Sequence, residues 1–178
     1  MTEKIVLVPG DGIGKEIAES VKAVSAVLTP AITWVHHEAG AEYYEQHGAL
    51  FDPSLLEDIE HTGVCIKGPT ATPVGTGFRS INVQLRQAFH TNINLRPVHS
   101  LPGVNSRYED VDIVIFRENS EDLYKGVEYM YDRDTAHGIK IISKEASANI
   151  ITASFEYARK HHRHKVTCVH KANIMKLT

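Results

Sequence analysis

A stretch of concentrated charge follows an apolar segment in the middle of the chain. Residues 116–124 read Phe-Arg-Glu-Asn-Ser-Glu-Asp-Leu-Tyr, which places Arg117, three acids and Tyr124 directly after the apolar segment 111–116. That segment is predicted to be an apolar strand, and ligands of α/β proteins bind outside the carboxyl ends of strands. A polar surface loop is the alternative, but two further segments favour a catalytic site.

The first of these segments is a predicted helix over residues 79–86. Arg79, Asn82 and Arg86 are spaced i, i+3 and i+7, so they share one face of this helix. Ser80 lies near the start of the helix, where free backbone amides favour an anion. The helix therefore presents polar and cationic groups on a single side.

Two later arginines, Arg96 and Arg117, lie at the ends of segments of their own. A guanidinium group pairs with a carboxylate through two parallel hydrogen bonds. If these two arginines and Arg86 converge on one cleft, they would suit a substrate with several carboxylates. Separate surface arginines are the alternative.

The second segment covers residues 166–176 and reads Val-Thr-Cys-Val-His-Lys-Ala-Asn-Ile-Met-Lys. Its apolar start predicts a buried strand over 166–169, followed by Lys171 and Asn173. A lysine at a strand end can act as a base if burial or a nearby cation lowers its pKa. A solvated lysine is the alternative.

Two loops rich in glycine and proline follow predicted strands. Residues 8–14 could hold a phosphate on backbone amides, but their glycines lack the G-x-G-x-x-G spacing, so a tight turn is favoured. Residues 67–75 present Lys67 and Thr72, either as a binding element or as a stiff connector. The histidine-rich residues 161–164 end a predicted helix, which favours an interaction with the helix dipole over a metal site.

The elements that would position these residues alternate between strands and helices. This alternation predicts an α/β fold with a mainly parallel sheet flanked by helices. Its strands are predicted over 5–8, 32–35 and 64–66, and its helices over 17–28, 40–47 and 53–60. Residues 127–131 and 139–142 predict a hairpin. A helix over 144–160 is predicted to start at Ser143 and to bury Ala146, Ile150, Ala153 and Tyr157 on one side.

Composition narrows the possible functions. The chain has 178 residues, 42% hydrophobic and 23% charged, which is ordinary for a globular protein. A net charge of −3 argues against a nucleic-acid partner, and the apolar runs are too short to cross a membrane. Cys65 and Cys168 lie in apolar runs and are predicted to be reduced core residues. With no apparent signal or transit peptide, these features predict a cytoplasmic protein.

Taken together, the segments resemble the decarboxylating β-hydroxyacid dehydrogenases, which include the isocitrate, isopropylmalate and homoisocitrate dehydrogenases. The motifs follow the family's order over the whole chain. They are Pro-Gly-Asp-Gly-Ile-Gly at 9–14, Lys-Gly-Pro at 67–69, Thr-Pro-Val-Gly at 72–75, Arg-Ser-Ile-Asn at 79–82 through Arg86, Asn-Leu-Arg-Pro at 94–97, Arg-Glu-Asn-Ser-Glu-Asp-Leu-Tyr at 117–124 and Lys-Ala-Asn-Ile-Met at 171–175. The polar pair Ser80 and Asn82 resembles the isocitrate branch, because isopropylmalate enzymes place apolar residues in that region.

The resemblance implies a role for each matched residue. The groups that would bind the carboxylates of a tricarboxylic acid are Ser80, Asn82, Arg86, Arg96 and Arg117. Tyr124 would protonate the enol after carbon dioxide leaves, and Lys171 would assist deprotonation of the hydroxyl across a dimer interface. Thr72 and Asn173 would contact the nicotinamide end of NAD or NADP, and Mg²⁺ or Mn²⁺ would act as a Lewis acid.

The resemblance also implies a domain organisation. Residues 1–91 would form the N-terminal part of a large domain, 92–121 and 144–178 part of a smaller α/β domain, and 122–143 a clasp hairpin that pairs with its mate in a homodimer. Relatives take metal ligands from a downstream D-x-x-x-D helix, and no two aspartates of this chain have that spacing. We therefore expect the N-terminal part of such an enzyme, incomplete at the C-terminus.

The predicted activity of the parent enzyme is oxidative decarboxylation of isocitrate to 2-oxoglutarate, and the chain alone is expected to be inactive. Three alternatives stay open. They are a homoisocitrate dehydrogenase, an isopropylmalate dehydrogenase, and a non-catalytic subunit that binds carboxylates without the metal-ligand aspartates.

Overall fold

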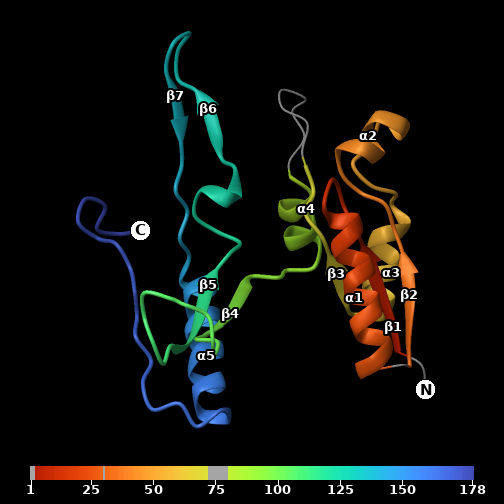
Figure 1. Ribbon diagram of the computed structural model, residues 1–178. Coiled ribbons are helices and arrows are strands. Elements are labelled where there is room, and N and C mark those ends of the chain that lie inside the picture. Colours follow the sequence, from red (N-terminus) through yellow and green to blue (C-terminus); the bar gives the residue numbers. More distant parts are fainter. Residues whose placement is uncertain (1–2, 30, 72–79) are drawn as a thin grey trace. The chain divides into compact units, whose positions relative to one another are not determined.

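A computed structural model describes residues 3–29, 31–71 and 80–178 of the chain. These residues divide into two compact units, Met1–Phe89 and His90–Thr178, and each unit is described by itself (Figure 1). Within the described residues, no helix has both the length and the apolar character needed to cross a membrane.

The first unit is built on a parallel sheet of three strands in the order β2-β1-β3. Its strands are β1 (Glu3–Val8), β2 (Ile32–His36) and β3 (Cys65–Lys67), and its helices are α1 (Gly14–Leu28), α2 (Ala41–His47), α3 (Ser54–Thr62) and α4 (Ile81–Ala88). The central strand sets the register, since Val6 lies opposite Val35 on one side and Cys65 on the other. This unit confirms the predicted α/β class with a parallel sheet flanked by helices.

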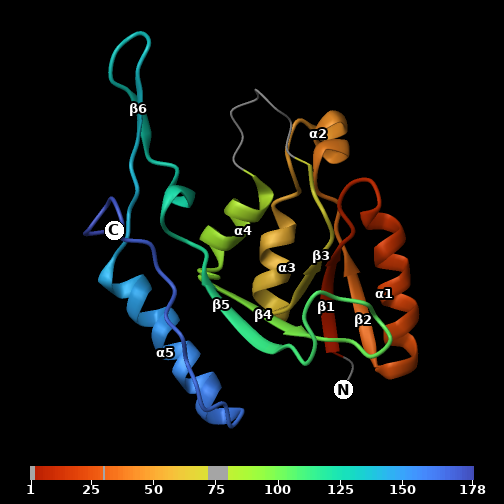
Figure 2. The ribbon, with the colours of Figure 1, turned by 60° about the vertical axis from the view of Figure 1, so that its left-hand side comes forward.

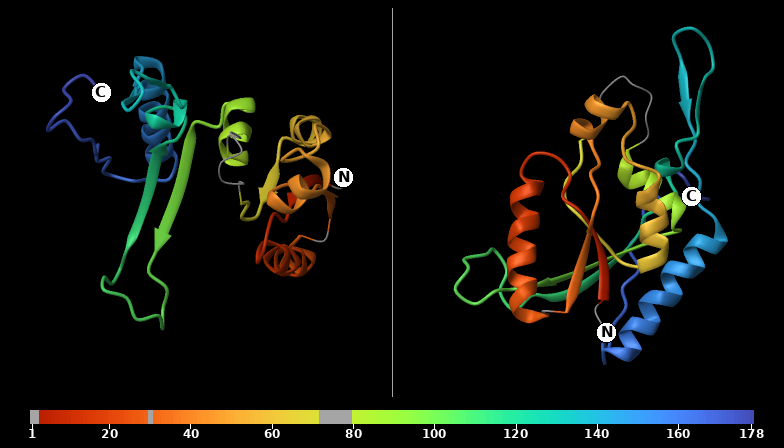
Figure 3. Two further views of the ribbon diagram at one scale, coloured as in Figure 1. Left: turned by 90° about the horizontal axis from the view of Figure 1, so that it is seen from above. Right: turned by 90° about the vertical axis from the view of Figure 1, so that its right-hand side faces the viewer.

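The alternation of side chains along β1 explains how helices cover both faces of this sheet. Val6 and Val8 are fully buried in a cluster with Leu55 of α3 and Ile81 of α4. Leu7, which lies between the two valines, points to the opposite face because successive strand residues alternate. Figure 3 shows α1 and α3 on opposite sides of the three strands.

The second unit contains two antiparallel ribbons and one long helix. Its elements are β4 (Ile93–His99), β5 (Asp112–Glu118), the short 3-10 helix η1 (Leu123–Lys125), β6 (Glu128–Met130), β7 (Ala136–Gly138) and α5 (Lys144–Lys160). Strands β4 and β5 pair with each other, as do β6 and β7. Helix α5 lies along the β4–β5 ribbon, with the ring of Tyr157 edge-on to Phe116 at 5.3 Å between centroids (Figure 2).

The start of α5 agrees with the prediction. The hydroxyl of Ser143 accepts a hydrogen bond from the backbone N–H of Ala146 at 3.1 Å, so Ser143 is the N-cap. Ala146 is buried, and Ile150, Ala153 and Tyr157 are half-buried on the same side of the helix.

Two details of the second unit differ from the sequence predictions. Strand β4 was not among the predicted strands, and β7 covers 136–138 rather than 139–142. The hairpin turn is shorter than expected, because the N–H of Tyr131 already donates to the carbonyl of Thr135 at 2.8 Å. Ile139 and Ile141 instead pair with Val127 and Asp122 at the base of the hairpin.

The predicted buried strand over 166–169 is wrong. These residues are exposed and have no regular secondary structure, and Val169 is 89% exposed. An apolar run becomes a strand only where another strand can pair with it, and no described residue pairs with this one. Cys168 is therefore exposed rather than in the core, whereas Cys65 is half-buried and its burial raises the pKa of the thiol.

Candidate functional site

The register of β4 and β5 places two predicted arginines on the same face of their ribbon. Arg117 lies directly opposite Asn94, and Arg96 directly opposite Ile115. Residues opposite each other share a face, and so do residues two apart along a strand, so Arg96 and Arg117 are diagonal neighbours. Helix α5 packs on the other face, through Phe116, and both arginines stay exposed.

The phenol of Tyr124 meets this arginine face. A guanidinium N–H of Arg117 donates to the Tyr124 hydroxyl at 2.7 Å, and the guanidinium carbon lies 5.7 Å from the centre of the tyrosine ring. On the β4 side, Arg96 Nε donates to the side-chain oxygen of Asn94 at 3.2 Å. The second unit therefore brings together two guanidinium groups and a phenol, all open to a ligand.

The three acids of residues 116–124 accept hydrogen bonds from backbone N–H groups of the chain rather than face a ligand. The carboxylate of Glu118 accepts hydrogen bonds from the N–H and hydroxyl of Ser120 at 2.9 and 2.6 Å, and from the N–H of Glu121 at 3.0 Å. Partial burial by itself would raise the pKa of Glu118, but these hydrogen bonds outweigh it and hold the pKa below the usual range.

Glu121 is almost fully buried and accepts the N–H of Ser143 at 2.6 Å, which ties it to the start of α5. Asp122 accepts the N–H of Leu123 at 2.8 Å. The acids thus shape the loop that carries Tyr124, while Arg117 and Tyr124 are the members that face outward. The sequence signalled the concentration of charge but not this division of roles.

Helix α4 of the first unit carries the second group of predicted residues. Ser80 is its N-cap residue, yet the Ser80 hydroxyl caps no backbone amide in the described part of the chain. Asn82 and Arg86 follow on the helix and are half-buried. The predicted residues Thr72 and Arg79 lie outside the described residues.

Lys67, at the end of β3, adds a second cation near Arg86. Burial lowers the pKa of the Lys67 ammonium group, and the positive charge of Arg86 lowers it further. The ammonium group donates to the carbonyl of Gly68 and to the hydroxyl of Thr70, the latter at 3.3 Å. The end of β3 and helix α4 thus place two cationic side chains within electrostatic reach of each other, and the Asp11 carboxylate also acts on Lys67.

The glycine-rich turn after β1 is occupied by contacts within the chain. Gly10 and Gly12 have positive φ angles of 77° and 56°, and a side chain on Gly10 would collide with the carbonyl of Pro69. The structure therefore supports the tight-turn interpretation rather than a phosphate cradle.

Asp11, within that turn, is a residue whose role the sequence did not reveal. Its carboxylate accepts the N–H groups of Ala41 and Glu42 at 3.2 and 3.1 Å, at the start of α2, and that of Ala71 at 2.6 Å, after β3. One carboxylate thus joins three segments that are distant in sequence.

Replacing Asp11 by alanine is expected to lower the free energy of unfolding by about 2 kcal/mol, because three amides lose a charged acceptor. Urea denaturation measures this change. Asp52→Ala is the matched control and should cost less, since Asp52 accepts the N–H of Ser54, two residues along the chain, at 2.8 Å and joins no distant segments by a hydrogen bond in the described part of the chain. Equal losses in the two variants would contradict the joining role of Asp11.

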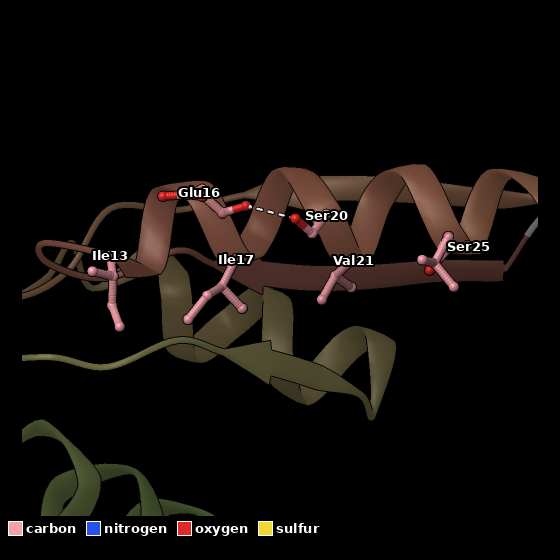
Figure 4. Close-up of a pocket in the computed structure, with 7 residues that line it drawn as sticks. Ile13, Glu16, Ile17, Ser20, Val21 and Ser25 are labelled. Carbon is pink, nitrogen blue, oxygen red and sulfur yellow. Dashed lines mark hydrogen bonds between the residues drawn. The ribbon is translucent and has the colours of Figure 1, made fainter. Parts of the chain in front are cut away.

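Two hollows of the first unit contain none of the predicted site residues. A groove of about 550 Å³ runs along α1 and is lined by Ile13, Glu16, Ile17, Ser20, Val21, Val24 and Ser25 (Figure 4). Within this groove, the Ser20 hydroxyl donates to the Glu16 carbonyl at 3.2 Å. A second hollow of about 280 Å³ lies between α1 and α2, where Lys15 pairs with Glu42 at 2.5 Å.

Lys171 and Asn173 lie exposed in the irregular segment after α5. Within the histidine-rich residues 161–164, Arg163 binds the start of β5. Its guanidinium forms two hydrogen bonds to the carboxylate of Asp112, at 2.7 and 2.6 Å. In residues 3–29, 31–71 and 80–178, no group of three or more His, Cys, Asp or Glu side chains could hold a metal ion. The described side chains therefore do not by themselves fit a divalent cation.

Comparison with known proteins agrees with this arrangement. The family model "Isocitrate/isopropylmalate dehydrogenase" matches residues 4–178, so the chain belongs to that family of oxidatively decarboxylating dehydrogenases. More particularly, it is 41% identical over 175 residues to the chloroplastic 3-isopropylmalate dehydrogenase of Solanum tuberosum, covering 98% of this chain and 49% of that protein. It is 43% identical over 172 residues to the mitochondrial isocitrate dehydrogenase [NAD] catalytic subunit 5 of Arabidopsis thaliana, covering 97% and 46%.

A crystal structure of isocitrate dehydrogenase from Methylococcus capsulatus matches the fold with a TM-score of 0.91 and 41% identity, over 99% of this chain and 53% of that one. Relatives are named as using NAD or NADP. The chain spans about half the length of the curated relatives it matches.

Proposed function

We propose that the protein acts in the oxidative decarboxylation of isocitrate to 2-oxoglutarate, with NAD or NADP as the hydride acceptor. The observation that carries this proposal is the contact between Arg117 and Tyr124 on the exposed face that also holds Arg96. Guanidinium groups bind the carboxylates of such a substrate, and a phenol beside them can supply a proton. Membership of the dehydrogenase family supports this assignment.

The proposed reaction has three chemical events. The substrate hydroxyl would lose its proton, and a bound nicotinamide would take up the hydride from the carbon that bears this hydroxyl, which would leave a ketone. The β-carboxylate then departs as carbon dioxide, and its bonding electrons form an enolate. Tyr124 donates its phenolic proton to the enolate carbon, while Arg96 and Arg117 hold the remaining carboxylates.

The remaining steps need residues whose positions relative to Tyr124 are predicted rather than observed. Lys171, supplied by a partner subunit, would accept the hydroxyl proton, and its exposure leaves it open to such a contact. Thr72 and Asn173 would contact the nicotinamide. When bound, Mg²⁺ or Mn²⁺ would polarise the hydroxyl and carboxylate oxygens, with ligands from outside the described residues.

We also propose that residues 122–143 mediate a homodimer. The β6–β7 hairpin extends away from the β4–β5 ribbon (Figure 1), and its side chains Tyr129 and Tyr131 are exposed. In it, His137 stacks on Tyr131 at 4.9 Å and contacts the Tyr129 hydroxyl at 3.1 Å. A two-stranded ribbon is marginally stable by itself, so a pairing partner would stabilise it.

The polar start of α4 favours isocitrate over isopropylmalate as substrate. The hydroxyl of Ser80, which caps no backbone amide among the described residues, and the amide of Asn82 can hydrogen-bond a third carboxylate, whereas an isopropyl group offers neither of them a hydrogen bond. Arg86 on the same helix adds a positive charge.

Kinetics with isocitrate, homoisocitrate and isopropylmalate test this proposal. We expect kcat/KM for isocitrate to exceed that for isopropylmalate by about 10⁴-fold, as for sites that hydrogen-bond their substrate. A preference for isopropylmalate or homoisocitrate would overturn the substrate assignment. Binding of isocitrate without any turnover would instead favour a non-catalytic carboxylate-binding subunit.

A further inference from the structure

Asp122 has a backbone conformation that residues other than glycine rarely adopt. Its φ and ψ angles are 62° and −139°, close to a region that is essentially restricted to glycine. Such strain persists only where the surrounding structure enforces it, and it clusters at functional sites. Asp122 lies two residues before Tyr124.

Two hydrogen bonds hold Asp122 in this conformation. Its backbone N–H donates to the carbonyl of Ile141 at 2.8 Å, and its carboxylate accepts the N–H of Leu123, also at 2.8 Å. Lys140 Nζ lies 3.6 Å from the second carboxylate oxygen. The chain is thus fixed to the base of the hairpin immediately before η1 begins.

The residues on either side leave little freedom for the turn that follows. The preceding residue, Glu121, is buried and anchored to the N–H of Ser143. After η1, Gly126 ends the turn with a φ of 64° and donates to the carbonyl of Leu123 at 3.0 Å. The direction of this single turn decides where the Tyr124 ring points.

We propose that Asp122 is a positioning residue for the reaction. Its carboxylate caps η1 and holds the strained backbone, and this turn directs the Tyr124 phenol to Arg117, where the proton is delivered. This inference rests on the proposed function, because it assigns Asp122 a role through Tyr124. A residue that only stabilised the loop would change stability without changing the rate of the folded enzyme.

Three variants of the active protein test the role of the carboxylate. Asp122→Ala and Asp122→Gly both remove the carboxylate that accepts the Leu123 N–H. Glycine adopts a positive φ without backbone strain, so Asp122→Gly is expected to fold even if Asp122→Ala does not. We expect both to lower kcat by roughly tenfold to a hundredfold, as for a misplaced catalytic group, with KM for isocitrate changed far less. Asp122→Asn keeps an acceptor oxygen and is expected to stay within about threefold of the wild-type kcat.

A second readout does not depend on activity. A nuclear Overhauser contact between the Tyr124 ring and the Arg117 side chain is expected in the wild type and in Asp122→Asn, and its loss is expected in Asp122→Gly. Lys140→Ala is the matched control and should retain both rate and contact, because its ammonium group, 3.6 Å from the Asp122 carboxylate, is beyond hydrogen-bond distance and such partly exposed ion pairs contribute little.

The outcomes separate this inference from the proposed function. A folded Asp122→Gly variant that keeps the Tyr124–Arg117 contact would overturn the positioning role, whatever its rate. Loss of the contact with an unchanged kcat would support positioning by Asp122 and would instead contradict the catalytic role of Tyr124.

Discussion

Replacing Tyr124 by phenylalanine is expected to lower kcat for isocitrate oxidation by about 10²- to 10⁴-fold, the usual contribution of a positioned general acid. The substitution removes the hydroxyl that Arg117 contacts at 2.7 Å and retains the aromatic ring. Because the carboxylates are held by arginines rather than by the phenol, KM should change little. Steady-state reduction of NAD or NADP by the active protein measures both constants.

Tyr108→Phe is the matched control for this substitution. Tyr108 is also exposed, at 65%, and lies in the segment between β4 and β5, so its hydroxyl should not affect the rate. Full activity of Tyr124→Phe would remove Tyr124 from the chemistry. An increase in KM alone, with kcat unchanged, would assign the phenol to substrate binding instead.

Local signals account for the elements that were predicted correctly from the sequence. Ser143 marks the start of α5 because a cap depends on residues within one turn. Glycines end α2 and α3 for a similar reason, since Gly48 and Gly63 take up positive φ angles of 71° and 70°. The alternation of short apolar runs with helical segments is likewise a local pattern, and it predicted the parallel sheet.

The failures concern pairing between distant segments. Residues 166–169 have the composition of a strand, but pairing requires a neighbour that composition does not specify. The residue range of β7 differs from the prediction because Ile139 and Ile141 pair at the base of the hairpin rather than within it. The joining role of Asp11 was also missed, since it depends on contacts with residues 41, 42 and 71.

The candidate site was likewise predictable where it depends on a local motif, and not where it depends on contacts between distant segments. The motif at 117–124 identified Arg117 and Tyr124, and the structure brings them into contact. It did not show that Glu118 and Glu121 serve the loop, because their partners include the backbone of Ser120 and Ser143. Convergence of Arg86 with Arg96 and Arg117 involves both units of the chain and stays a prediction.

The second large effect is expected from Arg117→Lys, which keeps the positive charge but replaces a planar guanidinium with an ammonium group. Arg117 has two tasks in the proposed site, since it faces the substrate carboxylates and also donates to Tyr124. Lysine cannot make two parallel hydrogen bonds to a carboxylate while holding the phenol. We therefore expect kcat/KM for isocitrate to fall by about 10²- to 10³-fold, the loss typical of a broken charge-assisted contact.

Arg163→Lys provides the matched control, because Arg163 also binds a carboxylate through two hydrogen bonds, but that carboxylate belongs to Asp112 of the same chain. This variant should lose thermal stability and keep kcat/KM within about twofold, as is usual for a substitution away from the substrate. Calorimetry with isocitrate separates binding from rate in both proteins. Wild-type affinity and wild-type kcat in Arg117→Lys would show that charge alone suffices there, and the guanidinium geometry on the β4–β5 ribbon would then have no part in recognising the substrate.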